Sequence, residues 1–291
     1  MANTKDLRNR ISSVKNTQQI TKAMKMVSAA KLRRAQQAII NARPYALRLR
    51  SVISKIAEGK GIEHRFFRKA EKPQSVLFIV LTSDRGLCGS FNSSIIRFAD
   101  KHYKENKHRY QTADFFFIGR RAAEFFKRRD VEAVDVVVNL AKDIKYGIAQ
   151  ELSTKILEWF ATEKYDEVQI IYNEFKSAIS QKVTCETLLP LNQTSEESAS
   201  LDLGGDLLFE PNADEILDQL LEKHFSIQIY RCMQESIASE HGARMNAMEN
   251  ATKNAGEMIR VLTLSLNKIR QAAITTELIE ITSGAEALQS S

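Results

Sequence analysis

The segment VLTSDRGLCGSFN (residues 80–92) holds residue types that could bind a phosphate group. It contains Gly86 and Gly89 beside the charged residues Asp84 and Arg85, and it lies between an apolar run and a sequence typical of a helix. At such a strand-to-helix turn, exposed backbone N–H groups and the helix dipole attract phosphate. The segment is therefore a candidate nucleotide site.

The phosphate-binding motifs do not match this segment. A P-loop requires G-x-x-x-x-G-K-[ST], which occurs nowhere in the chain, and Gly86 and Gly89 do not supply the dinucleotide-binding motif G-x-G-x-x-G. No histidine or second carboxylate adjoins Asp84 in sequence to form an acid–base pair. A structural turn is the favoured interpretation, ahead of a protein contact and, last, of catalysis.

The cysteines and histidines do not indicate a metal centre. Cys88, Cys185 and Cys232 are odd in number and far apart, which fits neither a disulfide framework nor a C-x-x-C metal site. The five histidines lack the spacing of metal ligands. We therefore expect no metal, no cofactor and no catalytic residue in this chain.

Positive charge is concentrated at one end of the chain. Residues 1–70 contain 17 lysines and arginines against three acids, a local net charge of +14, whereas the whole chain has a net charge of +6. Such a segment needs an acidic partner or a solvated surface. Nucleic acid would bind these side chains through its phosphates, but almost no aromatic residue precedes Tyr45 to stack on bases. The solvated face of a helix is therefore favoured over nucleic-acid binding.

Long helices at both ends of the chain would carry the charged residues. Apolar side chains recur every three or four positions between Leu7 and Ile56, which is the period of a helix with one apolar stripe. A helix over residues 3–57 would be roughly 80 Å long. Pro44 predicts a bend or a break within it.

The C-terminal residues 211–287 show the same period and would form a helix on the order of 110 Å long. Polar residues interrupt its apolar seam, namely His241, Arg244, Ser265 and Thr276. The two terminal stripes are most simply buried against each other. The pattern therefore predicts an antiparallel coiled coil of the N- and C-terminal helices.

The middle of the chain alternates short apolar runs with amphipathic segments, which predicts a Rossmann-like α/β domain with a mostly parallel sheet. A further run at 182–189 predicts an edge strand. The other expected strands are residues 75–82, 113–119, 134–139 and 167–172, with helices near 91–106, 119–129 and 143–162. The predicted fold class is α/β with long helices, divided into an N-terminal helix (1–57), a linker (58–74), the α/β domain (75–210) and a C-terminal helix (211–291).

Three segments resemble the γ subunit of the F-type ATP synthase, the central rotor shaft of that enzyme. They are MKMVSAAKLRR (residues 24–34), TSDRGLCGSFN (residues 82–92) and RQAAITTELIEITSGAEA (residues 270–287). The third is the most specific, and all three occur in the order found in the family. The resemblance covers both terminal helices almost completely and the middle domain more loosely.

The resemblance implies a coiled coil that rotates inside a ring of alternating α and β subunits, with the α/β domain at the foot of the shaft against the ε subunit and the membrane-embedded c-ring. One copy per complex would couple ion-driven rotation to ATP synthesis or hydrolysis on β, without a nucleotide site of its own. An acidic loop of β would then be the partner of the basic end. Polar interruptions of the C-terminal seam are expected where that helix extends alone. The alternative is a basic coiled-coil protein that binds nucleic acid or acts as a scaffold.

The resemblance also implies roles for particular residues. Met24 and Lys25 would face β, although Met24 also fits the seam of the helix pair. A C-terminal cluster would hydrogen-bond a loop of β, the alternative being pairing along a solvated helix; it consists of Arg270, Gln271, Thr275 and Glu277. The side of the foot near ε and the c-ring would include Asp84, Arg85, Asp206 and Phe209.

Two departures from the family pattern refine this expectation. Ser90 stands where the family usually has a second glycine, so close backbone approach is less favoured there. The cysteine pair of the chloroplast version is absent, and no transit peptide or signal sequence precedes the first helix. These features favour a bacterial protein held peripherally at the cytoplasmic face of the plasma (inner) membrane.

Overall fold

The computed structural model describes residues 4–60, 66–67, 73–139, 145–191 and 213–289. The chain packs into two compact units, one of residues 28–244 and the other of residues 1–27 with 245–291. In chain order the elements are α1 (Thr4–Lys60), β1 (Ser75–Leu81), α2 (Phe91–Asn106), the 3-10 helix η1 (Lys107–Arg109), β2 (Thr112–Ile118), α3 (Arg120–Lys127), β3 (Ala133–Val137), α4 (Tyr146–Ala161), β4 (Glu167–Phe175), β5 (Gln181–Leu189) and α5 (Ala213–Gln289). Helices α1 and α5 contribute residues to both units.

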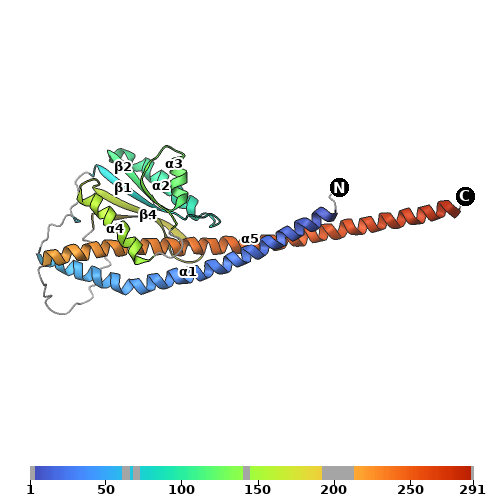
Figure 1. Ribbon diagram of the computed structural model, residues 1–291, viewed down its shortest axis with the longest axis horizontal. Helices are drawn as coiled ribbons and strands as arrows, with labels where there is room; N and C mark the ends of the chain where they lie inside the picture. The colour runs from blue at the N-terminus through green and yellow to red at the C-terminus, as the bar shows by residue number, and fades with distance from the viewer. Residues whose placement is uncertain (1–3, 61–65, 68–72, 140–144, 192–212, 290–291) are drawn as a thin grey trace. The chain divides into compact units, whose positions relative to one another are not determined.

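The larger unit is built on a five-stranded sheet in the order β3-β2-β1-β4-β5 (Figure 1). Neighbouring strands from β3 to β4 are parallel, and β5 runs antiparallel at the edge beside β4. Strand β1 reads SVLFIVL, a continuous apolar run, because both of its faces are buried. The predicted mostly parallel sheet and its edge strand are confirmed.

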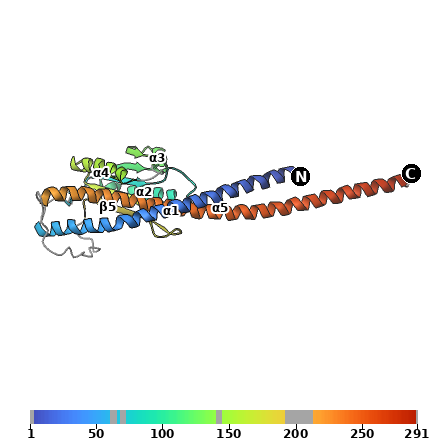
Figure 2. The ribbon, with the colours of Figure 1, turned by 60° about the horizontal axis from the view of Figure 1, so that its bottom comes forward.

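The side chains of β1 alternate between two cores, one on each face of the sheet. Val76 and Phe78 belong to the core formed with α2 and α3. Leu77 and Ile79 belong to the other core, which includes α4 and buried side chains of α1 and α5, for example Leu217. Figure 2 shows this second layer, with α1 and α5 running side by side in opposite directions. Helix α5 is therefore part of the core of the sheet-containing unit.

The turn from β2 into α3 requires glycine. Gly119 has a φ of +104°, and a Cβ atom there would lie 2.0 Å from the carbonyl oxygen of Thr82. The amide of Thr82 also donates to the carbonyl of Ile118 at 2.8 Å. The carboxyl ends of β1 and β2 are thus held in direct backbone contact, which positions residues 82–92.

The smaller unit is an antiparallel pair of helical segments. Thr21 Oγ1 lies 2.8 Å from Thr252 Oγ1, and Lys25 Nζ lies 3.2 Å from Glu249 Oε2. The residue numbers of the pairs add to 273 and 274 (21 with 252, 25 with 249), so the start of α1 lies opposite about residue 270 of α5. Every side chain from 270 to 285 is exposed, as expected once α1 has ended. The predicted antiparallel coiled coil is confirmed.

Of the bend or break predicted at Pro44, the break is wrong, because α1 continues through this residue, and the bend stays a prediction. Pro44 removes the hydrogen bond to the carbonyl of Ile40, but both residues are exposed, so water can hydrate that carbonyl. The predicted linker at 58–74 and the division at 210 stay predictions, since parts of these regions lie outside the described residues.

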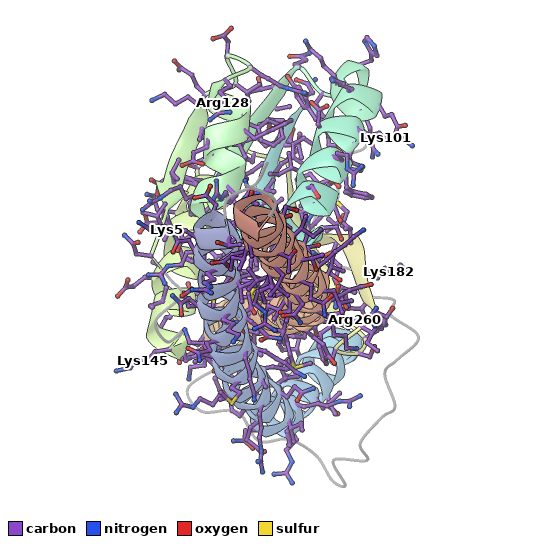
Figure 3. All side chains as sticks on the ribbon, turned by 90° about the vertical axis from the view of Figure 1, so that its right-hand side faces the viewer. Lys5, Lys101, Arg128, Lys145, Lys182 and Arg260 are labelled. Atoms are coloured by element: carbon purple, nitrogen blue, oxygen red, sulfur yellow. The ribbon has the colours of Figure 1, made fainter. Side chains whose placement is uncertain are left out.

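Basic side chains project into solvent from both units. Lys5 and Arg260 do so in the smaller unit, and Lys101, Arg128 and Lys182 in the larger (Figure 3). The placement agrees with the interpretation of the basic N-terminal segment as a solvated helix face. Among the described residues, no helix combines the length and apolar character needed to span a membrane.

Replacing Gly119 with alanine should destabilise the larger unit by about 3 kcal/mol, because the new Cβ meets the Thr82 carbonyl and alanine is strained at this φ. The measurement is chemical denaturation of the purified chain. Gly147→Ala is the matched control: nothing lies within 4 Å of a Cβ at this position in α4, so alanine should be neutral or stabilise by up to about 1 kcal/mol. Equal stability of the two variants would contradict the argument.

Candidate functional site

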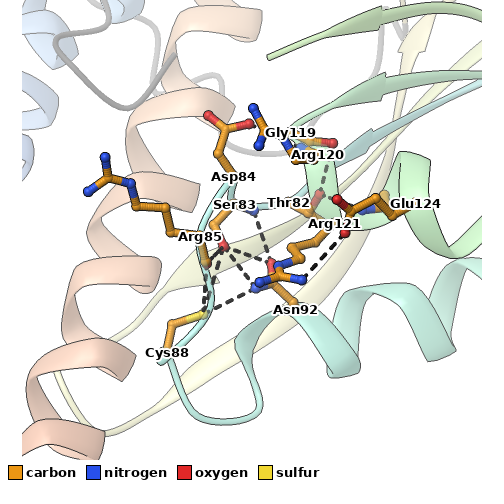
Figure 4. A network of polar contacts seen from close by, with 11 residues as sticks. Thr82, Ser83, Asp84, Arg85, Cys88, Asn92, Gly119, Arg120, Arg121 and Glu124 are labelled. Carbon is orange, nitrogen blue, oxygen red and sulfur yellow. Dashed lines mark hydrogen bonds and ion pairs between the residues drawn. The ribbon is translucent and has the colours of Figure 1, made fainter. Parts of the chain in front are cut away.

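The segment of residues 82–92 leads from β1 into α2, and its polar side chains form hydrogen bonds within the segment (Figure 4). The amide of Ser83 donates to Asn92 Oδ1 at 3.0 Å, and its hydroxyl donates to the carbonyl of Arg85 at 2.6 Å. Asn92 Nδ2 donates to Cys88 Sγ at 3.2 Å. Cys88 is buried, and burial raises the pKa of its thiol. These contacts account for the segment as a structural turn.

Asp84 and Arg85 have different surroundings. The Asp84 carboxylate accepts hydrogen bonds from the amides of Arg120 at 3.1 Å and Asn139 at 2.8 Å. It therefore ties the end of β1 to the segments that follow β2 and β3. The side chain of Arg85 is exposed. Of the two residues, only Arg85 presents its charged group freely at this edge of the sheet.

A small cavity of about 40 Å³ lies at the carboxyl ends of β1 and β2. In open α/β sheets, ligands bind in the crevice at this edge, and small-molecule sites usually have a volume of about 300 Å³ or more. Here α5 forms one wall of the cavity through Met233, Ser236, Ile237 and Glu240.

A buried ionic cluster fastens α5 to the same turn. Arg244 Nη1 lies 2.6 Å from Glu240 Oε1. Nη2 of Arg244 donates to the carbonyl oxygens of Gly86 at 3.2 Å and Arg85 at 3.4 Å. Arg244 is only 8% exposed. Since a buried guanidinium requires partners for its charge and its donors, these contacts hold α5 and the turn together.

The electrostatics of this cluster follow from burial. Burial raises the pKa of Glu240 above its ordinary value, and the charge of Arg244 opposes that shift. Burial, followed by the charge of Arg244, lowers the pKa of His241 to about 4. His241 is therefore neutral near pH 7, and its Nδ1, 3.3 Å from Arg244 Nη1, accepts a hydrogen bond from the guanidinium.

The polar interruptions predicted in the seam of α5 are of two kinds. Thr276 is exposed, as expected where α5 extends alone, whereas Ser265 is exposed on the solvent side of the helix pair. His241 and Arg244 are buried within the sheet-containing unit. The expectation that they interrupt the seam because the helix extends alone is therefore wrong for them. The sequence signal that could have indicated their role is the spacing of Glu240 and Arg244, which are opposite charges four residues apart on one helix.

In the smaller unit, Met24 and Lys25 lie where α1 faces α5. Met24 is half-buried, and Lys25 forms an ion pair with Glu249, which also pairs with Lys253 at 3.3 Å. Hydrogen bonds from Lys25 and then Lys253 lower the pKa of Glu249. The flanking side chain of Met26 is 59% exposed. The segment thus has one side in the helix pair and one side open.

The C-terminal cluster of Arg270, Gln271, Thr275 and Glu277 is exposed throughout. Thr275 Oγ1 donates to the carbonyl of Gln271 at 2.9 Å, so this hydroxyl has a local partner. The cluster begins 21 residues beyond Glu249, roughly 30 Å along a helix. The structure therefore does not bring it together with Met24 and Lys25. Asp206 and Phe209 lie outside the described residues.

Comparison with known proteins links the whole chain to one family. A sequence model of the family described as "ATP synthase" matches residues 3–288. The ATP synthase gamma chain of Bdellovibrio bacteriovorus is 54% identical over 99% of this chain and all of its own length. The ATP synthase gamma chain of Geobacter metallireducens is 45% identical, again over 99% of this chain and its full length.

Solved structures show the same fold. A chain of the central stalk and c-ring structure of Tetrahymena thermophila mitochondrial ATP synthase is 29% identical with a TM-score of 0.63, over 80% of this chain and 99% of its own length. A chain of the Euglena gracilis mitochondrial ATP synthase has a TM-score of 0.68 at 22% identity, over 98% of this chain and 94% of its own. The second likeness concerns the fold alone.

The low pKa of His241 predicts how stability depends on pH. An unfolded histidine binds a proton near pH 6.5, whereas the folded one does so only near 4, so the unfolded state binds more protons in between and stability falls as the pH falls through this window. The variant His241→Gln can still accept the hydrogen bond from Arg244. As the pH falls through this window, its free energy of unfolding should decrease by up to about 3 kcal/mol less than that of the natural chain.

The measurement is the free energy of unfolding of both proteins across this pH range. The raised pKa of Glu240 acts with the opposite sign, because stability falls there as the pH rises, but it contributes to both proteins and cancels in their difference. A difference that stays constant with pH would show that His241 is not held neutral.

Proposed function

This chain belongs to the family of ATP synthase gamma chains, and we propose that it turns as the rotor shaft inside a ring of α and β subunits. As a gamma chain it is part of the central stalk and rotor and takes part in ATP synthesis. The proposal concerns how it does so. Its contacts, not chemistry of its own, would couple rotation to nucleotide turnover on β.

The observation that carries the proposal is the exposure of α5 on all sides from residue 270 to 285. One stripe of this segment is apolar: Ile274, Leu278 and Ile281 are 50%, 58% and 63% exposed, at spacings of four and three residues. A continuous exposed apolar stripe marks a protein contact. We therefore assign this segment to the bore of the ring.

The different faces of this segment explain how three equivalent β subunits could be driven to different states. The apolar stripe faces one direction, with Arg270 and Glu277 along its edge, while Thr276 and Ser283, seven residues apart, lie on the opposite side of the helix. Each β subunit would meet a different face, so the contact free energy would favour a different conformation in each. Because such coupling is reciprocal, hydrolysis on β would drive the shaft through the same contacts.

The proposed β contacts are the open side of Met24 and Lys25 and the cluster of Arg270, Gln271, Thr275 and Glu277. In the larger unit we propose contact with ε and the c-ring through Asp84, Arg85, Asp206 and Phe209. The exposed charge of Arg85 supports its place in this group. Asp84 would act by holding the turn, since its carboxylate is bonded to backbone amides.

We further propose that the subunit is non-catalytic and present once per complex. Two observations support the first point: the cavity at the carboxyl edge of the sheet, lined in part by α5, has a volume of only about 40 Å³, and residues 82–92 lack a phosphate-binding motif. The complex would hold the chain peripherally at the cytoplasmic face of a bacterial plasma membrane, as its bacterial relatives suggest.

The proposal is tested by co-expressing the chain with α and β subunits from one organism and measuring ATP hydrolysis by the purified complex. We expect a stable complex with one copy of this chain and rotation-coupled hydrolysis. Failure to form the complex, together with DNA binding that weakens steeply with salt, would support the alternative of a basic nucleic-acid-binding protein.

Arg270→Ala should lower ATP hydrolysis by the assembled complex about tenfold, because a hydrogen bond from a charged group to β is lost. Lys268→Ala is the matched control: it removes an equal charge from an exposed position on the same helix, outside the cluster. It should leave hydrolysis near the natural rate. An equal loss in both variants would mean that only the charge of the helix matters.

A further inference from the structure

Helix α5 is joined to the sheet-containing unit by directional polar contacts as well as by its apolar core. Ser226 Oγ lies 2.8 Å from Ser153 Oγ on α4. The hydroxyl of Ser239 donates to the carbonyl of Asn173 on β4 at 3.0 Å. Arg244 donates to the turn after β1. These contacts occur over about 27 Å of helix.

Arg231 lies between these contacts and joins α5 to both strands at one edge of the sheet. Its Nη1 donates to Tyr172 Oη on β4 at 3.2 Å, and its Nη2 pairs with Glu186 Oε2 on β5. Tyr172 Oη donates to Glu186 Oε1 at 2.6 Å, which closes a ring of three side chains. Nη1 and Nε of Arg231 also donate to Glu235 and Gln228 on α5 itself, at 3.1 and 3.0 Å. The guanidinium thus connects both strands to α5.

The positions of these contacts around α5 determine what motion they oppose. At about 100° per residue, Ser226 and Arg244 share one side of the helix, whereas Arg231 and Ser239 lie roughly 140° away in either direction. A rotation of α5 about its own axis would therefore break bonds on different sides at once. Apolar contacts are non-directional, so the polar contacts oppose slip most directly.

We propose that the ring of Arg231, Glu186 and Tyr172 is the joint through which torque passes between the sheet and α5. This inference rests on the proposed rotor function and adds to it the residues that transmit the load. Arg231 is a positioning residue: it touches neither nucleotide nor ion, and it prevents α5 from turning against the sheet. Charge-assisted hydrogen bonds suit this task because they combine strength with fixed geometry.

The test uses the assembled, membrane-bound ATP synthase and compares ATP hydrolysis with ATP-driven ion pumping against an increasing opposing gradient. Arg231→Met keeps the length of the side chain but removes its charge and donors. We expect hydrolysis without load to persist and pumping to be lost at a smaller opposing gradient. Amide exchange in residues 226–244 should become about tenfold faster, as the lost charged hydrogen bonds predict.

The matched control is Lys155→Met, which removes the 2.6 Å ion pair between α4 and Asp135 on β3, in the same unit but away from α5. It should pump against load like the natural chain. Arg231→Lys should recover part of the load-bearing ability, because lysine keeps the charge. If Arg231→Met prevents assembly, Glu186→Gln decides the question, since it preserves the shape and weakens the same ring.

The outcomes separate the two proposals. Failure of the natural chain to assemble and pump would overturn the rotor function itself. With a functional natural complex, unchanged pumping against load in both Arg231→Met and Glu186→Gln would overturn the joint alone. An equal loss in Lys155→Met would also overturn it, because general loosening of the unit would then explain the effect.

Discussion

Helix α5 is buried against a sheet along one part of its length and exposed on all sides along another, and the rest of the structure depends on how one continuous helix meets both conditions. Between Leu217 and Met233 it belongs to the core on one face of the sheet, and buried side chains continue as far as Arg244. From residue 270 to 285 every side chain of α5 is exposed among the residues that the structure describes. Between these parts it pairs with α1 through contacts such as Thr21 with Thr252. The side chains of α5 change character along the helix because each part has a different neighbour.

The fold could be predicted largely from the sequence, because its main signals are local. The three- and four-residue spacing of apolar residues predicts both terminal helices, and the apolar runs predict every strand of the sheet. Pro44 was misleading because the cost of a proline depends on whether the freed carbonyl can reach water. The helix register, fixed by pairs such as Lys25 with Glu249, could not be predicted, since a period of 3.6 residues recurs equally well after a shift of one heptad.

The candidate site was predictable only in part. The exposed C-terminal cluster follows from a sequence motif, whereas the role of Arg244 required the fold. In a seam formed by two helices alone, a buried arginine would lack partners and would destabilise the pair. Once the sheet is present as a third partner, the same arginine satisfies the carbonyl oxygens of Arg85 and Gly86. The contact joins residues 158 positions apart or more, which no local pattern reveals.

The register of the helix pair also sets a limit on the shape of any partner. A single α-helix with its side chains is about 10–12 Å across, and a second helix packed beside it adds about 8–10 Å. Because α1 begins opposite about residue 270 of α5, the described part of the smaller unit narrows there to about half its width. An opening that encloses this end closely must taper by the same amount at the same level. The start of α1 thus limits how far a closely fitting opening can receive the helix pair. Adding turns to the start of α1 would widen the tip and prevent its full insertion into that opening.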